Sequence, residues 1–283
     1  MKKSNAINII LVIILLAGLS LLLYPSVSDY WNSFHQSQAI ANYAENVSQL
    51  DEEQYSDLWS AAEAYNSSLL DRSSSYMLSE EQMAEYKSLL DPSGYGVMGY
   101  VEIPSINCSL PLYHGTEESV LQIAVGHLEW SSLPTGGPGT HCVLSGHRGL
   151  PSAKLFTDLD RLVEGDLFML QVLDKVLTYE VDQILIVEPQ ETSSLRIFDG
   201  KDYCTLVTCT PYGKNTHRLL VRGHRVETIE TKAAARVTSE AILIEPVIVA
   251  PVLALPMLLL LFIILCFPKK RKHHGGAAHG NRA

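Results

Sequence analysis

The two ends of the chain are continuous apolar stretches. No charged residue lies between Ser4 and Ser28, or between Pro246 and Pro268. A helix over residues 247–267 would rise about 30 Å, the thickness of the hydrocarbon core of a bilayer. The basic run at 269–272 follows at once, and such clusters mark the cytoplasmic side. We therefore expect a C-terminal transmembrane helix at 247–268 and a basic cytoplasmic tail at 269–283.

The N-terminal apolar stretch, residues 7–23, follows Lys2 and Lys3. This pattern predicts that segment 1–27 is a transmembrane anchor, with a cleaved signal peptide as the alternative. Both alternatives place the middle of the chain, up to residue 246, outside the plasma membrane.

Residues 28–94 carry a helical pattern. Their apolar positions repeat at spacings of three and four, which predicts an amphipathic helical lead-in. These positions are Ile40, Tyr43, Val47 and Leu50, followed by Tyr55, Leu58, Ala62, Tyr65 and Leu69. A serine-rich stretch at 66–76 interrupts the pattern before a short helix resumes over 81–90. The turn sequence at 91–94 is the expected domain boundary.

From Gly96 the pattern changes to short strands. Leu177, Tyr179 and Val181 alternate with polar residues, as in a half-buried strand. Strands are expected at 97–103, 142–145, 167–172, 177–187, 203–208 and 219–225, with short helices at 118–125 and 153–162. So many strands in a short region predict a mainly β domain, a closed or nearly closed antiparallel barrel at 95–230, followed by a linker at 231–246.

Charge is distributed unevenly along the chain. The two ends hold seven of the 21 basic residues and none of the 31 acidic ones, so the external part has a net charge near −17. Such an acidic domain argues against binding to nucleic acid or to anionic lipid.

Five cysteines are too few and too widely spaced for a disulfide scaffold. Cys266 falls in the predicted C-terminal span, and Cys209 ends an apolar strand that runs into a turn, TLVTCTPYG (205–213). A nucleophile at a strand end would be held by the sheet while its side chain reached solvent. On residue type alone, an inert buried cysteine is the alternative.

A cysteine nucleophile needs a basic partner, because a free thiol with a pKa of about 8.5 is mostly protonated at neutral pH. His147 lies between two glycines in SGHRG (145–149), which favours a tight turn after a strand. Arg218 follows Cys209 across a hairpin turn and could stabilise an oxyanion. His147 could instead be an ordinary surface residue, and Arg222 on the same hairpin competes with Arg218.

Several motifs together resemble the class C, or pilin-polymerising, sortases of Gram-positive bacteria. The resemblance covers about residues 60–226 and includes the C-terminal anchor. Its motifs are LSGHRGLPSAKLFTDL (144–159), TLVTCTPYG (205–213), NTHRLLVRG (215–223), GVMGYVEIP (96–104) and YHGT (113–116).

This resemblance implies an eight-stranded sortase barrel with Cys209 as nucleophile, His147 as acid–base partner and Arg218 as stabilising cation. The implied reaction cleaves an LPXTG-like sorting signal between Thr and Gly through a thioester. A lysine amine of a pilin subunit then resolves the thioester, without a cofactor. The partners implied are pilins or other surface proteins that bear sorting signals.

Other positions within or near these motifs complete the candidate site. Ser145, Thr208 and Tyr212 are candidate substrate-binding residues. The class commonly has a lid anchored by an Asp-Pro-aromatic motif, but the corresponding stretch here, SYMLSE (75–80), has neither the aspartate nor the proline. Tyr76 and Met77 are therefore the candidate lid residues.

The cysteines and histidines also allow other interpretations. Cys204 is five positions before Cys209 on one strand, so we expect it on the opposite face, where it cannot form a local disulfide with Cys209. His141, Cys142, Cys204 and Cys209 lack the paired spacing of zinc ligands, and no metal site is expected.

Two alternative functions stay open at the level of sequence. One is a sortase that attaches single surface proteins to cell-wall peptide amines. The other is a membrane-tethered binding module whose cysteine does no chemistry.

Overall fold

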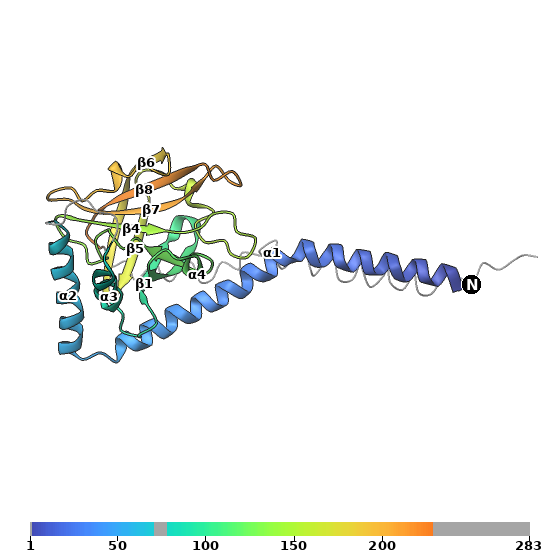
Figure 1. The fold of residues 1–283 in the computed structure, drawn as a ribbon, viewed down its shortest axis with the longest axis horizontal. Coiled ribbons are helices and arrows are strands. Elements are labelled where there is room, and N and C mark those ends of the chain that lie inside the picture. Colours follow the sequence, from blue (N-terminus) through green and yellow to red (C-terminus); the bar gives the residue numbers. More distant parts are fainter. Residues whose placement is uncertain (1, 71–77, 229–283) are drawn as a thin grey trace, which may run out of the picture. The chain divides into compact units, whose positions relative to one another are not determined.

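The computed structural model describes residues 2–70 and 78–228 (Figure 1). The chain divides into two units, of which the structure describes residues 2–24 and residues 25–70 with 78–228 respectively. The predicted linker, C-terminal span and basic tail lie outside the described residues, as do the candidate lid residues Tyr76 and Met77.

The first unit contains the start of helix α1 (Lys2–Ser48). Among the described residues, α1 is the one helix long and apolar enough to cross a membrane by length and composition, with a mean hydropathy of 2.5. Its apolar side chains, including Ile10, Ile14 and Leu21, are exposed. An N-terminal membrane anchor therefore fits the structure.

The helical lead-in consists of the second half of α1, then α2 (Glu52–Leu70) and α3 (Glu80–Ser88). Ser79 caps α3 in a capping box with Gln82, which explains why the helix resumes there. Many of the predicted apolar positions are buried and pack into the same core as the barrel, among them Ala62, Tyr65 and Leu69. The three- and four-residue spacing thus identified the packed faces correctly.

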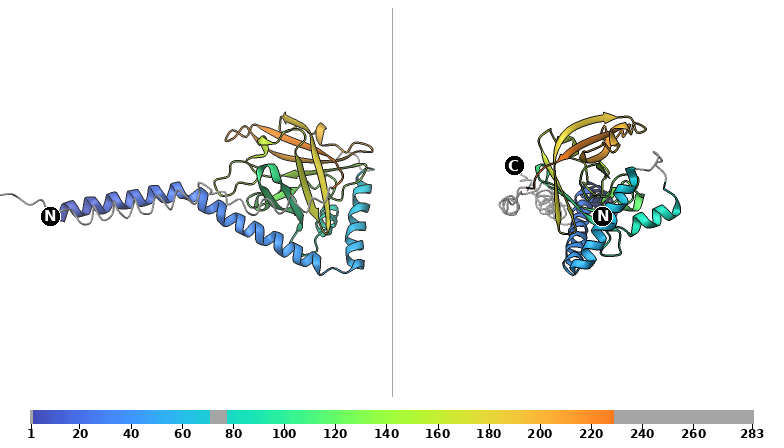
Figure 2. Two further views of the ribbon diagram at one scale, coloured as in Figure 1. Left: turned by 180° about the vertical axis from the view of Figure 1, so that it is seen from behind. Right: turned by 90° about the vertical axis from the view of Figure 1, so that its left-hand side faces the viewer.

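Eight strands form a closed barrel in the order β1-β2-β3-β4-β7-β8-β6-β5 (Figures 1 and 2). Their bounds are β1 Val97–Ile103, β2 Cys108–His114, β3 Val125–His127, β4 Thr140–Ser145, β5 Leu167–Val172, β6 Lys175–Val187, β7 Asp202–Thr210 and β8 His217–Arg225. The short helical elements are α4 Glu118–Leu121 and the 3₁₀ turns η1 Pro104–Ile106, η2 Leu159–Arg161 and η3 Ser193–Leu195. The six expected strands are present.

The expectation of an antiparallel barrel was wrong in part. The pairs β2–β3 and β4–β7 are parallel, because crossover connections return the chain to the same end before each second strand. Strands β2 and β3 were not predicted. β3 has only three residues, too few to show an alternating pattern.

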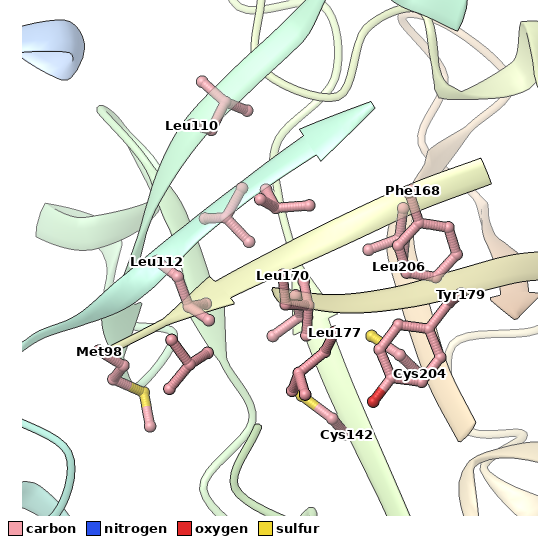
Figure 3. Close-up of a cluster of buried hydrophobic side chains, with 14 of the residues drawn as sticks. Met98, Leu110, Leu112, Cys142, Phe168, Leu170, Leu177, Tyr179, Cys204 and Leu206 are labelled. Atoms are coloured by element: carbon pink, nitrogen blue, oxygen red, sulfur yellow. The ribbon is translucent and has the colours of Figure 1, made fainter. Parts of the chain in front are cut away.

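The barrel interior is filled by large apolar side chains (Figure 3). Phe168 stacks on Tyr179 with ring centroids 5.5 Å apart. Cys142 of β4 and Cys204 of β7 are register partners inside this core. This apolar interior supports β4, β7 and β8, whose ends carry the candidate site.

Candidate active site

Cys209 and Arg218 face each other across the β7–β8 hairpin. They are directly paired in the antiparallel register, between the pairs Thr208–Leu219 and Thr210–His217. Residues directly opposite in such a pair project on the same side of the sheet. The thiol and the guanidinium therefore share one face, whereas His217, the neighbour of Arg218, projects to the other.

That shared face is the outer face of the barrel. Cys204 and Leu206 belong to the interior core, so the odd-numbered side chains of β7, including Cys209, project outward. Cys209 is a free, half-buried cysteine, whereas Cys142 and Cys204 are buried. Burial also raises the pKa of the Cys108 thiol to about 12. Cys108 is half-buried like Cys209, but its raised pKa disfavours the thiolate, so Cys209 is the best candidate nucleophile among the cysteines that the structure describes.

His147 lies two residues beyond the end of β4, the strand next to β7. The parallel register pairs Ser145 with Val207, and two hydrogen bonds continue it. The Gly146 amide donates to the Val207 carbonyl at 3.1 Å, and the Thr208 hydroxyl donates to the Gly146 carbonyl at 2.7 Å. The next residues along the two strands are His147 and Cys209. The fold therefore brings His147, in the turn after β4, level with Cys209 near the end of β7.

Glycines on both sides of His147 are required by close packing. A Cβ atom on Gly146 would lie 2.6 Å from the Phe156 ring. Gly149 has a φ of +74°, and a Cβ there would lie 2.8 Å from the Tyr212 ring. The Phe156 amide also donates to the His147 carbonyl at 3.1 Å. The SGHRG motif thus allows the histidine turn to pack against the loops around it.

The surroundings of Arg218 and Arg222 separate the two candidate cations. Arg222 is paired with Asp182 through two hydrogen bonds of 2.9 and 3.1 Å, and it lies opposite Thr205 rather than Cys209. The Arg218 guanidinium bonds only to backbone carbonyls in the described residues, those of Asn215 and His217. Arg218 is the cation with charge available to a ligand.

Two acidic residues near His147 were missed by sequence reasoning. A carboxylate oxygen of Glu118, on α4, lies 3.6 Å from the Nε2 atom of His147. Asp160, in η2, pairs with Arg148, whose guanidinium also donates to the Thr210 hydroxyl at 3.3 Å. Neither acid belongs to a strand pattern, and only the folded loops bring them near the site. Arg148, by contrast, directly follows His147 in the motif.

The candidate substrate-binding residues differ in what they expose. Tyr212 is 61% exposed beside Gly149, and Ser145 is half-buried. Thr208 is only 1% exposed, and its hydroxyl donates a hydrogen bond to the Gly146 carbonyl. The geometry of Thr208 supports alignment of the two strands rather than direct contact with a ligand.

His141, another histidine near the predicted motifs, is fully buried. Its Nδ1 atom lies 2.7 Å from the Arg196 carbonyl, and its Nε2 atom lies 2.7 Å from the Thr205 hydroxyl. Burial lowers the pKa of His141 to about 4. A buried, neutral and fully bonded imidazole is a structural group. In the described part of the chain, no three His, Cys, Asp or Glu side chains are grouped so as to hold a metal ion.

The family model and the curated relatives that match this chain both name the sortases. Residues 101–226 match the model of the sortase domain. Sortase D of Bacillus subtilis is 32% identical over 146 residues, which cover 50% of this chain and 71% of that protein.

Solved structures extend the similarity. Sortase C1 from Streptococcus agalactiae has 50% identity and a TM-score of 0.66, covering 68% of this chain and all of that one. Sortase C of Clostridium perfringens, solved with the C-terminal cell wall sorting motif, has 43% identity and a TM-score of 0.60. That match covers 68% of this chain and 100% of the other. The chain belongs to the sortase family, the cysteine transpeptidases, and its structural neighbours include class C sortases.

Proposed function

We propose that this sortase polymerises pilins by joining an LPXTG-like sorting signal to a lysine amine of the next subunit. The observation that carries the proposal is the outward-facing pair of Cys209 and Arg218, level with His147 in the turn after the adjacent strand. Similarity to a sortase C solved with a sorting motif supports the class of donor substrate. That the donor is a pilin and the acceptor a lysine amine is proposed here for this chain.

The first half of the reaction forms a thioester. The Cys209 thiolate attacks the carbonyl carbon of the threonine, and the electron pair of the C=O bond moves to oxygen. Arg218, whose charge has no carboxylate partner in the described residues, stabilises this oxyanion. The C–N bond then breaks, and the leaving glycine amine takes a proton from the His147 imidazolium.

The second half transfers the acyl group. A neutral lysine amine attacks the thioester carbonyl, and its proton passes to His147 as the C–S bond breaks. The products are an isopeptide bond and the regenerated thiolate–imidazolium pair. One amide bond is exchanged for another, so the reaction needs no oxidant and no external source of energy.

Incubation of the full chain in detergent micelles with a labelled sorting-signal peptide tests the catalytic assignment. Cleavage is expected for the wild type and absent for Cys209→Ala, and His147→Ala should be near background. Cys108→Ala is the matched control and should remain active. Equal cleavage by wild type and Cys209→Ala would overturn the nucleophile. Absence of cleavage by the wild type would favour the binding-module alternative.

A competition between acceptors tests the pilin proposal separately. The peptide is incubated with equal amounts of a peptide bearing a lysine ε-amine and a cell-wall peptide bearing a free amine, and mass spectrometry identifies the products. Transfer to the lysine acceptor is expected to dominate. Transfer chiefly to the cell-wall amine would instead support attachment of single surface proteins.

A further inference from the structure

One face of α1 is hydrogen-bonded to the rest of its own unit along residues 29–43. This unit also contains the barrel, and we call it the barrel unit. Four side chains on this face bond to backbone groups of that unit. They are Asp29, which accepts from the Lys154 amide at 2.6 Å, Asn32, which donates to the Ser152 carbonyl at 2.7 Å, Gln36, which donates to the Ile123 carbonyl at 2.7 Å, and Tyr43, which donates to the Met98 carbonyl at 2.8 Å. Positions 29, 32, 36 and 43 fall on one side of an α-helix.

The other side of the same helical stretch is apolar and exposed. Val27, Tyr30, Trp31 and Phe34 are 63%, 71%, 64% and 57% exposed. Their spacing of three, four and seven places them on one face, and at 3.6 residues per turn that face is opposite the hydrogen-bonded one. We call these four residues the aromatic face. Val27, Tyr30 and Phe34 therefore point away from the barrel. Trp31, at the edge of this face, also borders a groove whose other wall includes Pro111, Tyr113 and Ile123.

The position of this face along the chain favours lipid as its partner. It directly follows the charge-free stretch 5–27, and the only charged residue from 28 to 44, Asp29, is on the hydrogen-bonded side. At 1.5 Å per residue, Tyr30 to Phe34 lie about 5–10 Å beyond Val27. The headgroup layer beyond the hydrocarbon core extends over a similar distance, and Tyr and Trp concentrate there.

A protein partner is less consistent with the size of the aromatic face. An aromatic side chain buries about 150–250 Å², so the three partly exposed aromatic residues together with Val27 offer roughly 500 Å². A stable protein–protein interface takes about 800 Å² from each partner. A lipid surface has no such minimum, because it continues beyond the edge of the face.

We propose that the aromatic face rests in the headgroup layer of the membrane and so fixes the height and orientation of the catalytic barrel. The proposal rests on the N-terminal membrane anchor. The opposite side of α1 is bonded to the barrel unit at four points. A fixed position of the helix at the membrane therefore also fixes the position of the barrel. The site then works at a set position above the bilayer.

Fluorescence quenching of the full chain in nanodiscs that hold one copy each tests this placement. Lipids brominated either near the glycerol end or near the chain end are compared, and the difference between wild type and Trp31→Phe isolates the signal of Trp31. We expect strong quenching by the first lipid, weak quenching by the second, and protection from aqueous iodide.

Each other outcome contradicts the proposal. Access of iodide without lipid quenching would mean that the aromatic face is in water. Protection from iodide without lipid quenching would mean that protein covers it. Because each disc holds one copy, that protein would be another part of this chain.

A functional readout uses the triple variant Tyr30→Ser, Trp31→Ser, Phe34→Ser, with Tyr95→Ser as the control for loss of an exposed aromatic residue. The triple variant should cleave a soluble sorting-signal peptide like wild type but lose activity on the same peptide tethered to the disc lipid. Unchanged cleavage of the tethered peptide would contradict the proposed positioning. Failure of the wild type on the soluble peptide would instead refute the proposed function, without affecting the quenching result.

Discussion

The outer face of the β7–β8 hairpin carries an arginine near each end, and the two ends are built differently. Arg222, opposite Thr205, is held by Asp182 and lies over the Tyr203 ring at 4.2 Å. Arg218, opposite Cys209, bonds only to two backbone carbonyls among the described residues. The same residue type on the same face is thus neutralised at one end and available at the other.

This difference shows how one sheet separates stability from chemistry. At the Arg222 end the fold pairs the arginine with a carboxylate and buries His141 with partners on both ring nitrogens. At the Arg218 end a cation and a half-buried thiol are left for a ligand. A cation without a carboxylate partner has more charge to offer an incoming ligand than one that the fold has already paired.

The largest expected effect comes from removing each arginine in turn. Arg218→Ala should lower the turnover of a sorting-signal peptide by about 10²–10³-fold, the usual cost of losing an oxyanion donor. Arg222→Ala should change turnover little but lower the free energy of unfolding by about 1–3 kcal/mol, since Asp182 loses its partner. Peptide cleavage and urea unfolding measure the two effects. The milder pair Arg218→Lys and Arg222→Lys should show the same difference. Equal losses of turnover within either pair would contradict the different roles of the two arginines.

The second effect concerns pH and His141. Its pKa is lowered by burial from an unfolded value of 6.5 to about 4, so folding favours the neutral form. The resulting stability is fully present above pH 6.5 and is lost as pH falls toward 4, in total about 3 kcal/mol. Urea unfolding at a series of pH values measures this slope. His141→Gln should flatten it, because the buried titrating imidazole is removed. An equal slope in wild type and His141→Gln would show that other groups cause the acid sensitivity.

A smaller effect is expected from Asp182→Asn, which frees Arg222 while keeping its position. The free energy of unfolding should fall by about 1–2 kcal/mol because a charged hydrogen-bonded pair becomes a neutral one. Turnover of the Arg218→Ala variant should not recover when Asp182→Asn is added, since Arg222 is four residue pairs from Cys209 along the hairpin. Recovery in that double variant would show that charge alone, rather than position, decides which arginine acts.

The smallest expected effect is that of Asp160→Asn. Asp160 holds Arg148, and Arg148 bonds to Thr210, directly after Cys209. Loosening this contact should lower kcat about fivefold, close to 1 kcal/mol, with little change in KM. Asp166→Asn, elsewhere on the surface, is the control. An unchanged kcat for Asp160→Asn would mean that the Arg148 contact does not position the strand end.

The sequence predicted well what depends on local pattern. The bounds of β1 and β5, a helix after the serine-rich stretch and the buried side of the lead-in all follow from the spacing of apolar residues. The motifs also pointed to the strand ends where Cys209, His147 and Arg218 lie.

What the sequence did not show depends on contacts between distant segments. Glu118 comes near His147 only because α4 packs beside the turn after β4. The choice between Arg218 and Arg222 needed the register of β6, which brings Asp182 to Arg222. The parallel pairing of β4 with β7 likewise arises from the path of the chain between them, which local periodicity does not encode.

Detection of the acyl-enzyme by mass spectrometry tests the central claim most directly. The full chain is mixed with a sorting-signal peptide that has no acceptor amine, quenched in acid and mapped by proteolysis. We predict one adduct, equal in mass to the peptide up to its threonine, on Cys209, released by hydroxylamine as a thioester should be. An adduct on another residue, or cleavage by the wild type with no adduct at Cys209, would contradict the account.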